Sequence, residues 1–171
     1  MHIKIIHHND LILYLQNYKE FFNEFQNYLI SLTHEYSSIE SYLKYLSNQM
    51  NKDDSAYFLL CFENDNKLIG IIKLLVFNDY ALYKNLIELN LGNKKIGYIG
   101  NLFISPRFRG NQYCERFLKL SNKISRDKFR IDHFVLCIHI SNSVSIHINT
   151  KLGAIKTNIY EFPDAPYYVY Y

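Results

Sequence analysis

The segment Ile96–Leu120 constrains the fold most, because it reads as a strand, a short basic loop and a helix in direct succession. The β-branched, aromatic and aliphatic residues at positions 96–104 are typical of a buried strand. Pro106 ends that strand because it cannot donate to a ladder. After Gly110 the apolar residues recur at helical spacing, at Cys114, Phe117, Leu118 and Ile124.

A loop that feeds directly into a helix creates a site for an anion. The N–H groups of the first helical turn have no partners within the helix, and they carry positive partial charge. Arg107 and Arg109 add full positive charge beside them. The segment therefore predicts an anion-binding loop that begins near Gly110.

Length and composition bound the class of protein. A chain of 171 residues suits a single domain over 1–171 with a substantial core. The net charge of +3 is too small to indicate a nucleic-acid or membrane partner. Cys61, Cys114 and Cys137 lie far apart, which favours a reducing, cytoplasmic location over a disulfide framework or a zinc site. The N-terminus lacks the apolar core of a signal peptide.

The rest of the chain alternates helical and strand patterns. We expect strands at 3–7, 57–63, 68–77, 133–140, 155–162 and 167–171, and helices at 11–32, 39–50 and 143–152. Ser37 and Glu40 resemble a capping box for the second helix. The stretch 78–95 is a long connection, and such loops are often functional. This order predicts an α/β fold, a mixed sheet with helices on both faces.

Two motifs resemble those of the GCN5-related N-acetyltransferase (GNAT) superfamily. Arg107 to Gly110 fits the first positions of its motif A, Arg/Gln-x-x-Gly-x-Gly/Ala, although Gln112 and Cys114 replace later small residues. The segment Leu136–Ala154 is similar to motif B, with matches at Leu136, Ile138, Asn142, Ile148, Lys151, Gly153 and Ala154. Ser145 and Asn149 stand where that motif has Ala and Tyr. The two motifs together make the match more specific than either alone.

The resemblance implies a GNAT-like fold in which the motif A strand and the next strand splay apart. Acetyl-CoA is then the expected co-substrate. Its pantetheine arm would pair with the backbones of Leu102, Phe103 and Ile104 as an added strand. Its diphosphate would lie on the amides of Arg109, Gly110, Asn111, Gln112, Tyr113 and Cys114, and Asn142 of motif B is a further cofactor-binding candidate. The side chains of Gln112 and Cys114 could crowd the approach of that ligand. Cys114 could also have a lowered pKa beside a helix N-terminus.

Acetyl transfer by direct attack on the thioester needs a base, an oxyanion donor and a proton source. A backbone N–H near Phe103 or Ile104 would polarise the thioester carbonyl. The base candidates are Tyr98, His139, Glu88 or a water chain, because the neutral amine is the nucleophile. Asn149 occupies the place of the family's acid Tyr, and it can donate a hydrogen bond but not a proton.

The sequence leaves the acceptor open, as a primary amine of a small molecule or a protein. Positions 100 and 101 lack the acidic residues that relatives use for polyamines, which disfavours such a substrate. Asp164 and the tyrosines of the tail are further candidates for acceptor contact. The tail strand could also pair with a second subunit to form a homodimer. The alternatives are a catalytically impaired acyl-CoA-binding or regulatory module, and a protein-interaction domain on the same fold.

Overall fold

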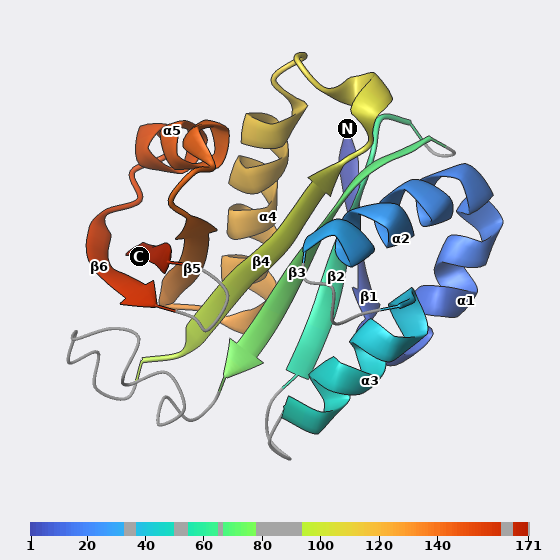
Figure 1. Cartoon of the computed structure of the whole chain (residues 1–171), viewed down its shortest axis with the longest axis horizontal. Helices are drawn as coiled ribbons and strands as arrows, with labels where there is room; N and C mark the ends of the chain where they lie inside the picture. The colour runs from blue at the N-terminus through green and yellow to red at the C-terminus, as the bar shows by residue number, and fades with distance from the viewer. Residues whose placement is uncertain (33–36, 50–54, 65–66, 78–93, 162–165, 171) are drawn as a thin grey trace.

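The protein is one mixed sheet between two layers of helices (Figure 1). The structure, a computed structural model, describes residues 1–32, 37–49, 55–64, 67–77, 94–161 and 166–170. Within these ranges the strands follow the spatial order β1-β2-β3-β4-β5-β7-β6. They are β1 (His2–His7), β2 (Ser55–Phe62), β3 (Leu68–Phe77), β4 (Ile96–Ile104), β5 (His133–His139), β6 (Lys156–Glu161) and β7 (Pro166–Tyr170).

One pair of neighbouring strands, in the middle of the sheet, is parallel, and the other pairs are antiparallel. β1 to β4 pair antiparallel, β4 and β5 pair parallel, and β7 pairs antiparallel with both β5 and β6. The parallel pair needs a crossover, which α4 (Tyr113–Phe129) supplies. The predicted mixed α/β sheet with helices on both faces is therefore confirmed.

The N-terminal helices cover one face of the sheet. They are η1 (His8–Asp10), α1 (Leu11–Leu15), η2 (Gln16–Tyr18), α2 (Lys19–Leu32) and α3 (Ile39–Gln49). Their apolar side chains form one core with those of β2, β3 and β4, centred on the fully buried Phe25, Phe58 and Leu15. Burying each such side chain contributes about 1.5–3 kcal/mol.

Two predictions for this face were wrong in detail. The helix predicted at 11–32 is interrupted by the 3₁₀ turn at 16–18, although this segment of the sequence contains neither proline nor glycine. The apolar positions continue through the turn, so the periodicity alone could not reveal the break. The cap of α3 lies one residue later than predicted, because Ser38 and Ser41 each accept the other's backbone N–H. 

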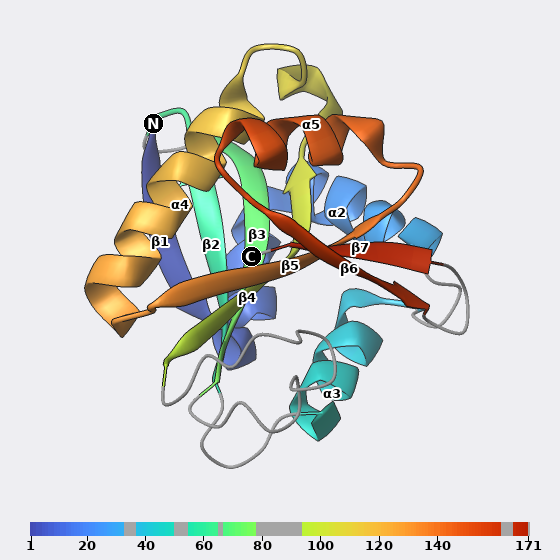
Figure 2. The same ribbon diagram turned by 90° about the vertical axis from the view of Figure 1, so that its left-hand side faces the viewer.

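Helices α4 and α5 (Ser143–Lys151) lie on the opposite face (Figure 2). Phe117 and Leu118 of α4 are buried against β3, β4 and β5, and Ile146 and Ile148 of α5 border the same cluster. η4 (Pro106–Phe108) lies between β4 and α4. The helices that carry the two motifs therefore share one layer of the molecule.

The tail strand does not lie at the edge of the sheet. β7 runs between β5 and β6, and β6 is the outer strand at that side. The prediction that the tail offers an edge to a second subunit is therefore wrong, because β6 already occupies the outer position. Asp164 and the predicted loop candidate Glu88 lie outside the described residues.

Candidate active site

The two central parallel strands separate part-way along their length. β4 and β5 pair only over Ile96–Ile99 and His133–Leu136. Beyond these residues β4 stays paired with β3 up to Ile104, and β5 stays paired with β7 up to His139. In Figure 2, β5 accordingly runs toward β7 while β4 continues to the loop before α4. From Gly100 onward, the β5 side of β4 is available to an extended ligand.

The predicted pantetheine edge lies on this unpaired stretch. Leu102, Phe103 and Ile104 are the last residues of β4. The Leu102 carbonyl accepts a long hydrogen bond from the Tyr28 hydroxyl, at 3.4 Å. The Phe103 side chain is buried against the rings of Phe21, Phe25 and Tyr28. Helix α2 thus holds this end of β4 by its side chains.

A bulge in β4 lies beside the point of separation. The register with β3 shifts between Ile71 and Lys73, which pair with Phe103 and Gly100. Asn101, inside the shift, has a φ of +49°, in the left-handed region where Asn is tolerated better than most residues. The Tyr42 hydroxyl donates to its side-chain oxygen at 2.9 Å. Such a bulge re-aims backbone groups, and this one is held in place by α3.

The loop before α4 has the backbone of an anion site. Gly110 has a φ of +83°, and a Cβ placed on it would meet no described atom within 4 Å. Protein atoms therefore leave the space above this glycine to a ligand. Gln112, the N-cap of α4, has a φ of +58° and makes no side-chain capping bond. The N–H groups of the first turn of α4 are thus left without a side-chain cap.

Side chains of the loop attach it to the surrounding elements. The Arg107 guanidinium pairs with Glu20 at 2.7 Å and with Glu24 at 3.6 Å, so its charge is directed to α2. The Arg109 Nε donates to the Ile104 carbonyl at 3.1 Å, and its guanidinium lies above the Phe103 ring. The expectation that Arg107 adds charge to the anion site is therefore wrong, since its partners are the carboxylates of α2.

The first turn of α4 is fixed in the same way. The Tyr113 hydroxyl donates to the Glu63 carboxylate, which leaves only the backbone N–H of this residue for a ligand. The Cys114 thiol is desolvated, and burial raises its pKa to about 11. The alternative of a lowered pKa beside the helix N-terminus is wrong, because desolvation has the larger effect on this thiol. Glu115 joins α4 to α5, since its carboxylate accepts from Lys151 at 2.7 Å.

The two asparagines of motif B have structural partners. The Asn142 side-chain oxygen caps α5 by accepting from the Ser145 N–H at 3.1 Å. Asn149 is buried, and its amide nitrogen donates to the Ser145 carbonyl at 2.9 Å. The Asn149 donor is thus engaged within its own helix.

The three predicted catalytic residues do not form one cluster. Asn149 belongs to α5, on the α4 side of the sheet, whereas Tyr98 packs with Leu75 and Phe77 near α3. The Ser141 N–H donates to the His139 Nδ1 at 3.2 Å, which places the proton of a neutral ring on Nε2. The nitrogen that would accept a proton is therefore already hydrogen-bonded.

One residue next to this site, Lys73, was not predicted from the sequence. β3 is buried at every position except this one, and its charged side chain reaches over Gly100. Burial lowers the pKa of the Lys73 ammonium to about 8. A single lysine inside the apolar run 68–77 was the signal that could have identified it.

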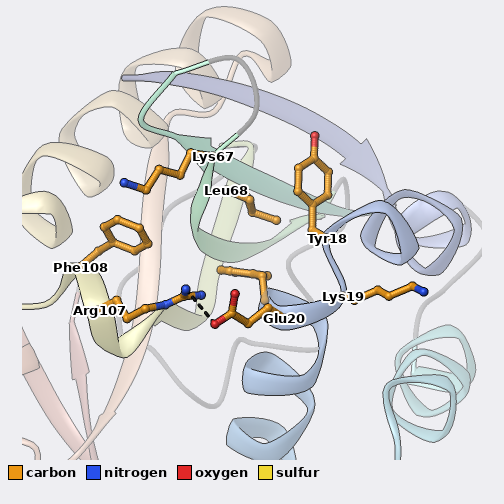
Figure 3. A pocket seen from close by; sticks show the side chains of 8 residues that line it. Tyr18, Lys19, Glu20, Lys67, Leu68, Arg107 and Phe108 are labelled. Atoms are coloured by element: carbon orange, nitrogen blue, oxygen red, sulfur yellow. Dashed lines mark ion pairs between the residues drawn. The ribbon is translucent and has the colours of Figure 1, made fainter.

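A pocket of about 230 Å³ lies on the other side of the loop, between the start of α2 and the β2–β3 turn (Figure 3). Its lining is Tyr18, Lys19, Glu20, Phe21, Lys67, Leu68, Arg107 and Phe108. In Figure 3 the Arg107 and Glu20 side chains meet, and Lys67 lies beside Phe108. Of the residues predicted for the anion site, this pocket includes only Arg107, and it includes none of the predicted catalytic or cofactor-binding residues.

The described residues contain no group of His, Cys, Asp and Glu that could hold a metal ion. In the same part of the chain, no helix has the length and apolar content needed to cross a membrane.

Solved structures share the fold over nearly the whole chain. A mutant of the spermidine N-acetyltransferase SpeG from Vibrio cholerae superposes with a TM-score of 0.64 at 13% identity, covering 99% of this chain and 93% of the other. NAA60 from Arabidopsis thaliana, in complex with acetyl-CoA, gives 0.62 at 12% identity, with 99% and 96% covered. An acyl-CoA N-acyltransferase from Pseudomonas aeruginosa gives 0.60 at 13%, with 99% and 98% covered. At these identities the likeness establishes the fold alone.

The sequence itself supplies the assignment. No curated protein sequence matches the chain. The model of the acetyltransferase (GNAT) family matches residues 18–154, which include both motifs, the separated strands and the loop before α4. That match covers well over half of the 171 residues. The chain therefore belongs to the GNAT acetyltransferase family.

Proposed function

We propose that this chain is an acetyl-CoA-dependent N-acetyltransferase that transfers the acetyl group to a primary amine of a small molecule or protein by direct attack. One observation carries the proposal: the unpaired side of β4 leads directly to the uncapped N-terminus of α4, with Gly110 between them. An extended arm followed by a diphosphate requires these two features in this order.

The residues present fit that ligand. The backbones of Leu102, Phe103 and Ile104 would pair with the pantetheine arm, and the amides of Arg109, Gly110, Asn111, Gln112, Tyr113 and Cys114 would hold the diphosphate. The diphosphate would be bound by backbone N–H groups. Gln112 and Cys114 have the same backbone N–H group as the glycines they replace, so the donors are kept. Gln112 is exposed and has a left-handed backbone, a conformation that glycine adopts without strain. Asn142 would add its amide nitrogen, because its oxygen is the part used in capping α5.

Acetyl-CoA would supply an activated acyl group as a thioester. A backbone N–H near Phe103 or Ile104 would polarise the carbonyl oxygen. The acceptor must lose its ammonium proton before its nitrogen can form the new bond to carbon, and the bond from carbon to sulfur then breaks. A thiol has a pKa of about 8.5, so water can protonate the leaving thiolate. Tyr98 or a water chain would take the amine proton, because the acceptor nitrogen of His139 is hydrogen-bonded.

A second candidate is a catalytically impaired acyl-CoA-binding module. The observation that favours it is the hydrogen bond from Asn149 to the Ser145 carbonyl, which removes a donor from the place of the family's acid. Binding of acetyl-CoA without turnover of any amine would select this candidate. A filled or narrowed gap between the central strands would favour the protein-interaction alternative, and the early end of the β4–β5 ladder argues against it.

We further propose that residues 1–171 form a single domain that acts in the cytoplasm, without a nucleic-acid or membrane partner. Three free cysteines and a net charge of +3 support this proposal. A homodimer stays a proposal as well, with β6 as the strand at the edge of the described sheet.

Calorimetric titration with acetyl-CoA, free CoA and ATP tests the cofactor. We expect acetyl-CoA and CoA to bind, and Gly110→Asp to abolish binding because it places a negative charge at the diphosphate site. Gly153→Asp is the matched control, since Gly153 also has a positive φ of +93° and an unoccupied Cβ position, at the far end of α5. Equal affinity of Gly110→Asp and wild type would refute the assignment of this loop. Release of CoA in the presence of amines then tests turnover.

A further inference from the structure

Lys73 is a lone cation in an otherwise buried strand. Every other residue of β3 is buried, whereas Lys73 is partly exposed. It pairs with Gly100 of β4. A Cβ on Gly100 would lie 3.0 Å from the Lys73 Cε and 3.4 Å from its Nζ. The lysine side chain therefore crosses the surface of β4 at Gly100, where the side chain of a larger residue would crowd it.

Two tyrosine rings flank the ammonium of Lys73. The Nζ lies 5.7 Å from the Tyr42 ring centroid and 5.5 Å from that of Tyr98. Among the residues that the structure describes, no Asp or Glu lies within ion-pair distance of Lys73. Burial lowers its pKa, and the nearby Cys137 opposes this only in part. A desolvated charge without a counter-ion is costly, and such groups gather at functional sites.

The ammonium lies where the central strands begin to separate. The last pair of the β4–β5 ladder is Ile99 with Leu136. Gly100 and Cys137, which both contact or face Lys73, are the next residues of the two strands. Tyr42 belongs to α3, so this position is on the face opposite to α4. A cofactor bound along β4 from the N-terminus of α4 would leave this face to the second substrate.

We propose that Lys73 binds an anionic group of the acceptor, and that the acceptor is a small amine which carries a carboxylate close to its amino group. This inference rests on the proposed function, because the proposed binding of acetyl-CoA along β4 places the thioester near the backbone of Phe103. An acceptor that carries an amino group but no anionic group would place its ammonium beside the ammonium of Lys73. A zwitterion supplies the missing counter-ion and keeps its amino group for the reaction.

The spacing along β4 limits the size of the acceptor. From Gly100 to Phe103 the strand rises about 10 Å at about 3.3 Å per residue, less the shortening at the bulge. Contacts of about 3 Å at each end, to the ammonium and to the acyl carbon, leave about 3–4 Å between the carboxylate and the amine. That separation fits an α- or β-amino acid. A polyamine does not fit the proposed acceptor site, because it would bring further positive charge to Lys73.

The test compares acceptors that differ only in the anionic group. Initial rates with acetyl-CoA are measured for an amino acid, its carboxamide and its aminophosphonate analogue. We expect kcat/KM for the acid to exceed that for the carboxamide about ten- to hundredfold, as for a hydrogen bond to a charged group. The phosphonate arm shows whether a carboxylate or a doubly charged anion is preferred. Equal kcat/KM for the acid and the carboxamide would overturn the inference while leaving the proposed function intact.

Three variants assign the preference to Lys73. Lys73→Arg keeps the charge and should keep the preference, whereas Lys73→Met should remove it. Lys4→Met is the matched control. Lys4 is an exposed lysine of β1, far from the strand separation, and its ammonium lies above the ring of Tyr14 from α1. If Lys73→Arg instead loses turnover of the carboxamide and the acid alike, Lys73 is a base and not an anion-binding residue, because Arg cannot give up its proton.

A labelling experiment gives a readout that does not depend on turnover. An amine-reactive reagent modifies Lys73, and peptide mass spectrometry measures the rate with the CoA-bound protein. We expect the amino acid to slow this labelling and the carboxamide to leave it unchanged, with Lys4 unaffected by either. If the amino acid protects Lys73 from labelling but no amine is acetylated, the acceptor site is retained and the proposed acetyltransferase activity is refuted. Turnover without protection or acid preference would refute the acceptor site and retain the enzyme.

Discussion

Replacing Lys73 by Met should change how the stability of the protein depends on pH. The folded chain holds the pKa of this ammonium at about 8, against 10.5 for an unperturbed lysine, because burial disfavours the charged form. Between these two values the unfolded chain binds more protons than the folded one. The wild-type free energy of unfolding therefore rises with pH through this window, and below pH 8 the folded state carries the full cost of the buried charge.

The size of the effect follows from the two pKa values. Integrating the difference in bound protons from pH 7 to pH 9.5 gives a gain in wild-type stability of about 2 kcal/mol. Lys73 keeps some contact with solvent, so this value is the upper end of the expected range. Lys73→Met has no charge to desolvate and should lack this gain. The other titrating groups are common to both proteins and cancel in the difference.

Urea unfolding at a series of pH values, read by far-ultraviolet circular dichroism, measures the two curves. The plotted quantity is the free energy of unfolding of Lys73→Met minus that of wild type, and we expect it to fall between pH 7 and pH 9.5. Lys4→Met, at an exposed site, should run parallel to wild type. A difference that stays flat across this range would show that the ammonium is well solvated, and the argument for an uncompensated cation at the strand separation would fail.

Three further substitutions or reactions test side chains near the proposed cofactor site. Asn142→Ala should lower the free energy of unfolding by about 1 kcal/mol, measured in urea, because it removes the cap of α5; Asn142→Asp, which keeps an acceptor, should recover most of it. Asn149→Ala should reduce kcat less than about tenfold, and a loss above a thousandfold would show that this amide acts on the reacting groups. Cys114 should react with iodoacetamide at pH 8 far more slowly than a free thiol, since its raised pKa of about 11 leaves about one thiolate in a thousand; labelling followed by mass spectrometry detects it.

The sequence pattern predicted the elements better than the side-chain contacts. The apolar run at 68–77 and the strand that ends before Pro106 are strands with the predicted limits, because burial and proline act locally. Gly110 has a φ of +83°, which glycine adopts without strain, and the anion-binding role of its loop stays a prediction.

What the sequence could not predict depends on partners distant in the chain. Lys73 became part of the site only through its register with Gly100 and the helix that brings Tyr42 above it. Arg107 lies in the predicted loop, yet its charge is directed to Glu20 because α2 passes beside that loop. No spacing rule within one segment contains such information.

The proposed anion site before α4 has a suitable backbone without a series of glycines. Gln112 adopts the left-handed conformation at a cost of about 1–2 kcal/mol for a residue with a Cβ. Side-chain bonds on either side of it can offset that cost: Arg109 to the Ile104 carbonyl before it, and Tyr113 to Glu63 after it. Each of these bonds uses a side chain and leaves the backbone N–H of its residue unused. These flanking contacts can therefore hold the left-handed conformation at a residue that is not glycine, and the backbone donors of the proposed diphosphate site are kept.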